Sequence, residues 1–463
     1  SKKRNTRYPR LFKNKRVVTK KGLITIHKID DKLYFEFPKS LLGREFLMGS
    51  SISATSDNTS GLVGQTMTTP LHIRFAIQED QVYMQNVTPV SRMDVYSNQS
   101  DISKAVAKSN ITPDMESFKI AAYNMDSTAV VFEVTKFFLA DNKRLPLFDQ
   151  NSSSLEDEKY GQLELKAVLK KNLSSIRNFY VFDDNLEINL DMSFYQSLLA
   201  SKKEVRGGNV RVKAVYSMLL LPEETMVWRL GDPRLGYTFT KKQKISTEKD
   251  GTAFSYLQHK WNLLPADEEA YRRGDLVAPR KPVVFYIDSD FPEAWKKAIK
   301  EGVNWWNEAF KMAGFKDAVQ TADFPANDTT FYAGNLKYSC IRYVPVNLSK
   351  TQSKVWVDPR SGEIINGTIF VGHDIAKTIA SQRFVQTAQV DERMRGIQLS
   401  EEVLLEGIRL YVAREVGHCL GLADNASASA AFSVESLRSP EFTRQNGIAS
   451  SVMDELPYNY IAQ

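Results

Sequence analysis

The side chains best suited to metal binding or catalysis lie close together near the C-terminal end of the sequence, between Arg414 and Asp424. His418 has Glu415 three residues before it and Gly421 three residues after it. A histidine and a glutamate at this spacing share one face of a helix, and the glycine lets the chain turn back after it. The turn would bring Asp424 toward His418, so that one imidazole and two carboxylates, all able to bind a metal, lie near one another.

Arg414 occupies the position at which a metal site of this kind needs its first ligand. In the H-E-x-x-H motif, histidines four residues apart hold zinc, and Arg414 stands where the first would be. A guanidinium stays protonated and has no lone pair for a metal. Arg414 either pairs with Glu415 and Asp424 in place of the cation or turns to solvent in a degenerate cleft. We favour pairing, because unpaired acids in a partly buried cleft are costly.

Few other side chains can complete a metal site. The sequence has five histidines: His27, His72, His259, His373 and His418. Of these, His373 is the one other candidate ligand in the C-terminal region, and the alternative is a strand-end histidine unrelated to metal. Cys340 and Cys419 lie in apolar or helical surroundings, which is typical of buried small hydrophobic residues rather than nucleophiles.

The composition is that of a globular protein, except for a strongly basic N-terminal segment. The 463 residues are enough for two to four domains, and 42% hydrophobic with 25% charged residues is ordinary for such proteins. The sequence contains no apolar run of the roughly 18 residues that span a membrane. Residues 1–21 carry ten Lys or Arg and no acid, which leaves the rest of the chain near −4. This basic arm is either a solvated linker or a segment that docks on an acidic or phosphate-rich surface. The rest shows no nucleic-acid motif, so we expect no nucleic-acid partner.

The first half of the chain is rich in strand patterns. Residues 22–29 and 32–38 alternate apolar and polar side chains around two aspartates, which predicts a hairpin. A short helical turn is expected at 40–46, and a Ser-, Thr- and Gly-rich loop at 50–69. Further strands are predicted at 71–77, 81–87, 118–122, 129–134, 178–182, 186–191 and 210–221.

The C-terminal part mixes strands with longer helices. The patterns predict strands at 282–287, 339–344 and 362–371 and an amphipathic helix at 292–313. Ser400 is a favourable N-cap for a further helix, with Glu401 and Glu402 at the positive end of its dipole. That helix would run into the segment that contains His418.

These motifs resemble those of a family of large bacterial zinc-dependent metalloproteases of the metzincin type, which carry two β-rich modules before a zincin domain. The resemblance covers essentially the whole chain, with its motifs in the family's order. The first module is resembled by residues 22–27 and 35–42, and the second by residues 70–265. The family's long helix is resembled by residues 305–310 (WWNEAF) and 313–315, and residues 357–364 resemble the segment that precedes the edge strand of the substrate cleft. The region after the active-site helix is resembled by residues 437–440 and 451–454.

The resemblance assigns roles by position. In active relatives, histidines at the positions of Arg414 and Asp424 bind zinc together with the equivalent of His418, and the glutamate polarises the zinc-bound water. It therefore implies that Glu415 is a vestigial general base, that His418 and Asp424 are vestigial ligands without metal, and that Arg414 replaces a ligand. Met453 looks like the methionine of the Met-turn, the thioether floor beneath the metal. No cofactor is expected here, although active relatives hold zinc.

The expected fold is a multidomain α+β chain with β-rich N-terminal modules and a metzincin-like (zincin) catalytic-type domain with a Met-turn. The expected domains are the basic arm 1–21, a hairpin module 22–50, a β-rich module 51–265 and a metzincin-like domain 266–463 with a C-terminal portion missing.

The expected function is that of an inactive pseudo-metalloprotease that binds envelope proteins or polypeptide, or acts as a scaffold. The scaffold role rests on analogy with other zincins that have damaged motifs. The resemblance implies a location at the cell envelope, anchored in the outer membrane or secreted, in a Gram-negative bacterium. The alternative is an active zinc endopeptidase that uses His418, Asp424 and an unidentified third ligand, with Glu415 as general base.

Overall fold

The computed structural model describes residues 7–57, 61–64, 66–88, 93–95, 104–105, 108–148, 155–157, 159–245, 253–328, 330–346, 351–396, 398–455 and 458–462. Two compact units divide the chain. The first comprises Ser1–Glu224 and Gln243–Ala253, and the second comprises Thr225–Lys242 and Phe254–Gln463. Within the described residues, no helix is long and apolar enough to cross a membrane.

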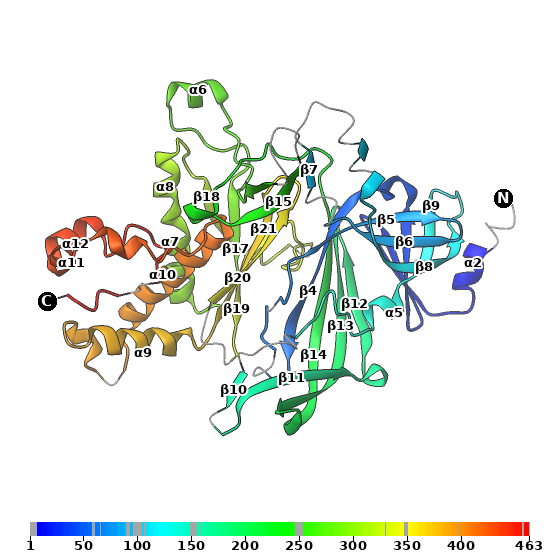
Figure 1. The fold of residues 1–463 in the computed structure, drawn as a ribbon, viewed down its shortest axis with the longest axis horizontal. Coiled ribbons are helices and arrows are strands. Elements are labelled where there is room, and N and C mark those ends of the chain that lie inside the picture. Colours follow the sequence, from blue (N-terminus) through cyan, green and yellow to red (C-terminus); the bar gives the residue numbers. More distant parts are fainter. Residues whose placement is uncertain are drawn as a thin grey trace. The chain divides into compact units, whose positions relative to one another are not determined.

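The first unit is built on one 13-stranded sheet (Figure 1). Its strands, in spatial order, are β1 (Val17–Lys21), β2 (Thr25–Ile29), β3 (Lys32–Pro38), β9 (Ala129–Glu133), β8 (Asp114–Tyr123), β6 (Gln81–Asn86), β5 (Leu71–Gln78), β4 (Glu45–Thr55), β14 (Lys203–Leu220), β13 (Asn185–Ala200), β11 (Gly161–Leu169) and β10 (Leu155–Asp157), with β12 (Ser175–Val181) also paired to β13. The short strand β7 (Met93–Val95) pairs in parallel with the end of β15 (Phe239–Ile245). Short helical segments are α2 (Arg7–Phe12), η1 (Lys39–Leu41), α5 (Thr135–Phe138) and η2 (Lys171–Leu173).

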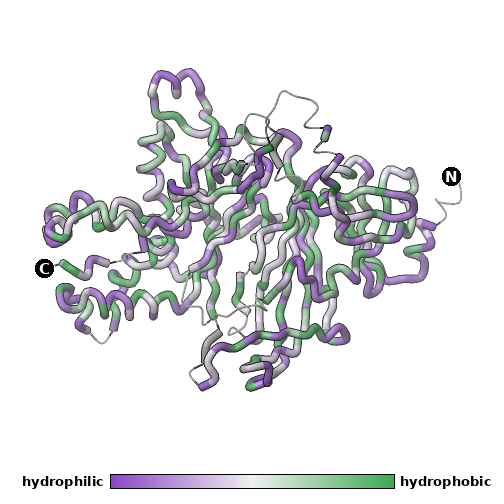
Figure 2. The backbone as a smooth tube through the Cα atoms, in the orientation of Figure 1, coloured by the Kyte–Doolittle hydropathy of each residue, from purple (hydrophilic) through white to green (hydrophobic). Residues whose placement is uncertain are grey.

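A two-residue turn closes the longest hairpin of this sheet. Strands β13 and β14 are joined by Ser201 and Lys202, which both have positive φ angles, of 48° and 68°. Two such residues in sequence form the turn whose twist matches that of paired strands. Residues of β14 are alternately buried and exposed from Val210 to Ala214, and all are buried from Ala214 to Leu219. Hydrophobic residues recur along these central strands in Figure 2.

Aromatic residues fill the core of the first unit. The rings of Phe37 and Phe75 have centroids 4.8 Å apart, and Phe46 and Phe132 surround them at 6.0–6.3 Å. All four side chains are almost completely buried. Burial of each phenylalanine contributes roughly 1.5–3 kcal/mol, so strands far apart in sequence are held in one core.

Residues 7–21 are not the extended basic arm that their charge predicted. Residues 7–12 form α2, and Val17–Lys21 form β1, which pairs antiparallel with β2. Tyr8, Leu11 and Phe12 pack on a small cluster around Ile29. These apolar side chains, spaced between the cations, are partly buried against the sheet and attach the segment to it. Residues 1–6 lie outside the described residues.

Two further expectations need correction in the first unit. The predicted hairpin at 22–38 is confirmed, but the helical turn at 40–46 is only η1, and β4 begins at Glu45. The loop expected from residue 50 begins later, because β4 continues to Thr55 against β14. The division into modules at 22–50 and 51–265 stays a prediction; strands of both ranges belong to one sheet, and β4 crosses the predicted boundary.

The second unit has a five-stranded mixed sheet in the order β18 (Val319–Asp323), β17 (Val283–Ile287), β19 (Ser339–Val344), β21 (Glu363–Gly372) and β20 (Thr351–Asp358). The first four strands run parallel, and β20 is antiparallel to β21. The edge next to β21 is therefore β20, and the strand predicted at 362–371 is internal rather than the edge strand that the resemblance suggested. Strand β20 went unpredicted, because several of its side chains are polar.

The other segments of the second unit are mainly helical (Figure 1). They are η3 (Pro233–Leu235), β16 (Ala253–Gln258), α6 (Glu268–Arg273), α7 (Glu293–Asn304), α8 (Trp306–Met312), α9 (Ile375–Thr387), η4 (Glu392–Met394), α10 (Glu401–Cys419), η5 (Ala428–Ala431), α11 (Val434–Arg438) and α12 (Pro440–Asn446). The helix predicted at 292–313 is thus divided at Trp305, and Gly314, with a φ of 88°, ends it as expected.

Candidate functional site

Helix α10 carries the residues that the sequence singled out. It begins at Ser400, whose side chain accepts a hydrogen bond from the backbone N–H of Val403, as the predicted N-cap requires. Its buried stripe, which includes Ile408, Val412 and Val416, belongs to the core between α10, α7 and the sheet. Helices α7 and α10 pass so closely that a Cβ atom on Gly302 would lie 2.6 Å from the backbone oxygen of Arg409.

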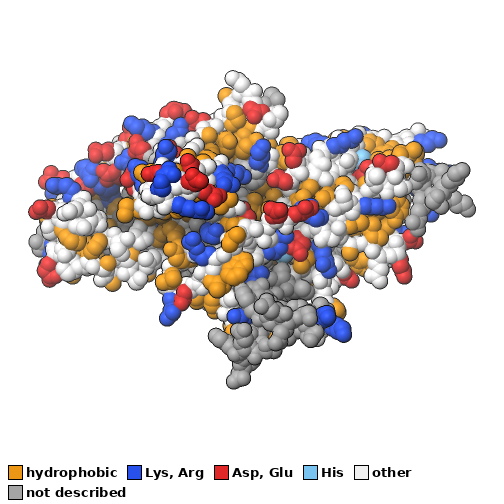
Figure 3. Space-filling model, turned by 90° about the horizontal axis from the view of Figure 1, so that it is seen from above, with side chains coloured by type: hydrophobic (Ala, Val, Ile, Leu, Met, Phe, Trp, Pro, Cys, Tyr) orange, Lys and Arg blue, Asp and Glu red, His pale blue; other side chains and the backbone are white. Residues whose placement is uncertain are grey.

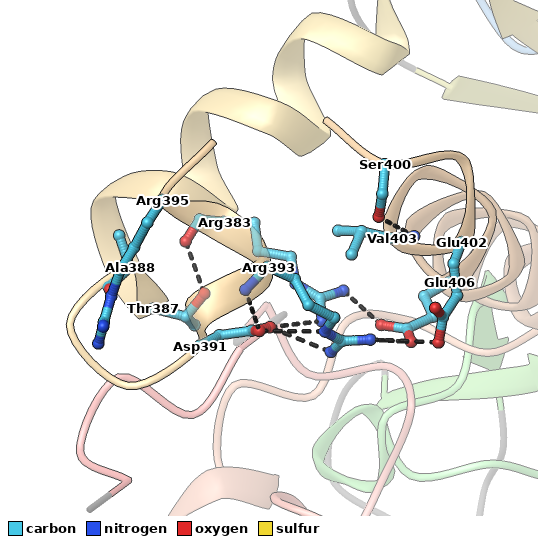
Figure 4. A network of polar contacts seen from close by, with 10 residues as sticks. All are labelled: Arg383, Thr387, Ala388, Asp391, Arg393, Arg395, Ser400, Glu402, Val403 and Glu406. Carbon is cyan, nitrogen blue, oxygen red and sulfur yellow. Dashed lines mark hydrogen bonds and ion pairs between the residues drawn. The ribbon is translucent and has the colours of Figure 1, made fainter. Parts of the chain in front are cut away.

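An ion-pair network fixes the N-terminal half of α10 to α9 and η4 (Figure 4). Arg383 donates to Glu406 at 2.6 Å and to Asp391 at 3.1 Å, and Arg393 donates to the same two carboxylates. Hydrogen bonds from Arg393 lower the pKa of Asp391 to about 2. Burial alone would raise the pKa of Glu406, but hydrogen bonds from the two arginines outweigh it and lower this pKa.

The chain turns sharply after α10, as the glycine in the sequence predicted. Gly421 has a φ of 96°, and a Cβ atom there would lie 2.4 Å from the backbone oxygen of His259. The backbone N–H of Thr238 donates to the oxygen of Gly421, and the N–H of Ala423 donates to the oxygen of Gly236, each at 2.9 Å. The exit from the helix is therefore held by a segment almost 200 residues earlier in the sequence.

Arg414 and Asp424 form an ion pair in the structure. Nη2 of Arg414 lies 2.7 Å from Oδ1 of Asp424 and 3.7 Å from Oε1 of Glu455. Nε2 of His418 lies 3.3 Å from the same Oδ1 atom, and its Nδ1 lies 3.0 Å from the backbone oxygen of Leu422. The predicted pairing of Arg414 with Asp424 is confirmed, and Arg414, His418 and Asp424 are brought together.

Glu415 has a different partner from the one that the sequence suggested. The hydroxyl of Thr351, at the start of β20, donates to Oε1 of Glu415 at 2.9 Å. Glu415 therefore links α10 to the edge strand, and its hydrogen bond within the described residues is not to Arg414. Thr351 was missed because a single threonine at the start of a polar strand has no sequence signal.

Met453 lies beneath α10 next to the candidate site. It is 2% exposed, and its Sδ atom would be 2.3 Å from a Cβ atom on Gly417, the residue before His418. The backbone N–H of Asn425 donates to the oxygen of Met453 at 2.9 Å. This position agrees with the predicted thioether floor, while the identification of a Met-turn stays a prediction.

The other histidines of the second unit are engaged elsewhere. The ring of His373 stacks on Trp295 with an interplanar angle of 12°, and its Nδ1 lies 2.5 Å from the hydroxyl of Tyr343. The two nitrogens of His259 contact the hydroxyls of Thr238 and Thr240, and burial lowers the pKa of this histidine to about 4.

The donor set near His418 does not fit a catalytic zinc ion. Such an ion takes three protein ligands and keeps one open position. No group of three or more His, Cys, Asp or Glu side chains is arranged to hold a metal in the described ranges. Moreover, the cationic side chain of Arg414 already donates to Asp424, whose Oδ1 atom lies 3.3 Å from Nε2 of His418.

Both cysteines are buried and unpaired, as predicted. Burial raises the pKa of Cys340 to about 12 and that of Cys419 well above its ordinary value. Neither thiol is therefore available as a thiolate near neutral pH.

Three family models match the chain in order. Residues 6–55 match a domain of unknown function (DUF5118), residues 64–266 match another (DUF5117), and residues 396–463 match the Met-zincin model (DUF4953). The last match covers α10, the turn at Gly421 and Met453. A search of the curated proteins and a search of the solved structures each returned no match.

Proposed function

Because this chain belongs to a multidomain metzincin-like family, we propose that it is a metalloprotease-like protein that has lost zinc catalysis and acts through binding. In this proposal the altered cleft is part of a scaffold or polypeptide-binding surface. Its partners are proteins of the bacterial cell envelope.

The observation that carries the proposal is the 2.7 Å contact between Arg414 and Asp424. A guanidinium at the first ligand position brings a permanent positive charge to the place that zinc would need. The same contact occupies the carboxylate that would be the third ligand. Since Glu415 accepts a hydrogen bond from Thr351, its role here is to connect α10 with β20 rather than to activate water.

The location rests on the resemblance to envelope and secreted relatives alone. Fractionation of cells that produce the full-length protein tests it: the protein should be in the membrane or secreted fraction. Recovery in the soluble cytoplasmic fraction would contradict this part of the proposal.

Metal content and peptide hydrolysis test the proposed loss of catalysis. Purified protein should contain far less than one zinc ion per chain and leave peptides intact. The double variant Arg414→His/Asp424→His should gain close to one zinc ion, because it restores three ligands around the turn. Arg438→His, which adds a histidine at an exposed position of α11, is the matched control and should gain none.

Stoichiometric zinc in the unaltered protein, with hydrolysis abolished by Glu415→Gln, would overturn the proposal. That result would support the alternative of an active endopeptidase with His418, Asp424 and a third ligand.

A further inference from the structure

A second candidate site lies in the first unit, far in sequence from α10. An open cavity of about 980 Å³ lies between α2, β8 and the segment 133–144, which contains α5. This volume is at the upper end of the range usual for small-molecule binding sites, roughly 300–1,000 Å³. Neither the metzincin resemblance nor the residues around His418 account for it.

The inner part of the cavity is apolar. Phe118 and Ile120, alternate residues of β8, are 7% and 8% exposed. Phe137 of α5 completes this surface, and its ring meets that of Phe118 edge to face with centroids 6.2 Å apart. Because these side chains already belong to the core of the unit, they offer a rigid apolar surface rather than a flexible one.

The rim of the cavity is basic. Five exposed cationic residues line it: Arg7, Lys119, Lys136, Lys143 and Arg144. Arg144 donates to the backbone oxygen of Met115, and none of the five forms an ion pair with any residue that the structure describes. Like charges gathered at one opening repel each other, and an anion between them would relieve that repulsion.

The acidic residues of the lining do not balance these charges. The lining contains Glu116, Glu133 and Asp141. Glu133 is already paired, with Nζ of Lys32 3.0 Å from its Oε2 atom. Five cations therefore face two carboxylates that form no ion pair within the described residues, so positive charge predominates around the cavity.

From this combination we propose that the cavity binds an amphiphilic anion, an apolar chain or ring that carries one carboxylate, sulfate or phosphate group. The apolar part covers Phe118 and Phe137, and the anionic group lies among the rim cations. Figure 3 shows Lys and Arg side chains interspersed with Asp and Glu on one face of the molecule. The lining of the cavity differs from such a mixture, because its five cations outnumber its three carboxylates.

Calorimetric titration of the full-length protein with dodecanoate below its micelle concentration tests the proposal. Dodecanoate should bind one site per chain, whereas dodecanol, dodecyltrimethylammonium and inorganic phosphate should each bind at least about tenfold more weakly. Equal affinity for dodecanol or for inorganic phosphate would overturn the proposal, since it requires both the anion and the apolar body.

Charge-removing variants locate the site. Lys119→Gln/Lys136→Gln should weaken dodecanoate binding about tenfold, because each partly exposed charge contact contributes up to roughly fivefold. Lys171→Gln/Lys213→Gln removes the same charge from exposed positions of the first unit outside the cavity and should change affinity less than about twofold. An equal loss in both variants would refute this location. Melting temperatures verify folding, and Lys136→Gln alone replaces the double variant if that variant is destabilised.

Discussion

Removal of Arg414 should destabilise the second unit more than neutralisation of its partner does. The Arg414→Ala variant loses both contacts of Nη2, at 2.7 Å to Asp424 and 3.7 Å to Glu455, and leaves two carboxylates near each other. The Asp424→Asn variant keeps an amide oxygen that can accept from Arg414. The order of the two effects is therefore the central prediction.

The expected loss of folding stability follows from the solvent exposure of the side chains involved. The side chains of Asp424 and Glu455 are 49% and 68% exposed, so water screens both contacts and each contributes at most about 1 kcal/mol. The side chain of Arg414 is only 25% exposed, so the loss of its buried methylenes adds roughly 0.5–1 kcal/mol. We expect about 1–2 kcal/mol for Arg414→Ala and about 0.5 kcal/mol for Asp424→Asn.

Thermal melting followed by tryptophan fluorescence is a suitable assay, because all six tryptophans lie in the second unit. For a unit of this size, 1 kcal/mol corresponds to roughly 2–4 °C. Arg414→Met keeps the apolar stem of the side chain without its charge. The difference in melting temperature between this variant and the unaltered protein should therefore shrink in about 1 M NaCl, where exposed ion pairs are screened. The reasoning is refuted if Asp424→Asn destabilises as much as Arg414→Ala, or if Arg414→Met melts like the unaltered protein at low salt.

Three other measurements test the surrounding structure. Hydrogen bonds from Arg393 lower the folded-state pKa of Asp391 from 3.8 to about 2. The stability that this carboxylate contributes is therefore present above pH 3.8 and disappears as pH falls through 2. Asp391→Asn should have a lower melting temperature than the unaltered protein at pH 6, and the two melting temperatures should converge near pH 2. The thiol of Cys340, whose pKa burial raises to about 12, should react with a thiol reagent only after unfolding; rapid reaction in the folded protein would contradict its burial. Gly302→Ala should destabilise the second unit by roughly 1–3 kcal/mol, because its Cβ would lie 2.6 Å from a backbone oxygen of α10, whereas Gly396→Ala, with its nearest atom at 3.6 Å, should have little effect.

The sequence by itself determined the elements whose signals are local. The hairpin at 22–38, the strand at 339–344, the cap at Ser400 and the glycine turn after α10 all form as predicted. Each depends on residues within a few positions of one another, where alternation, capping and backbone preference act directly. The identity of Arg414 also settled, without any structure, that one ligand position cannot bind metal.

The tertiary structure decided which distant residues share the site. The sequence allowed Arg414 to pair with Glu415, Asp424 or both. In the structure Arg414 pairs with Asp424, while Glu415 accepts a hydrogen bond from Thr351. The segment around Thr238, predicted as part of the β-rich module, belongs to the second unit because its backbone pairs with the helix exit. The basic N-terminal segment likewise folds from residue 7, since burial of its few apolar side chains outweighs charge repulsion. These outcomes depend on backbone pairing and side-chain burial between segments far apart in the chain, which local composition and spacing do not specify.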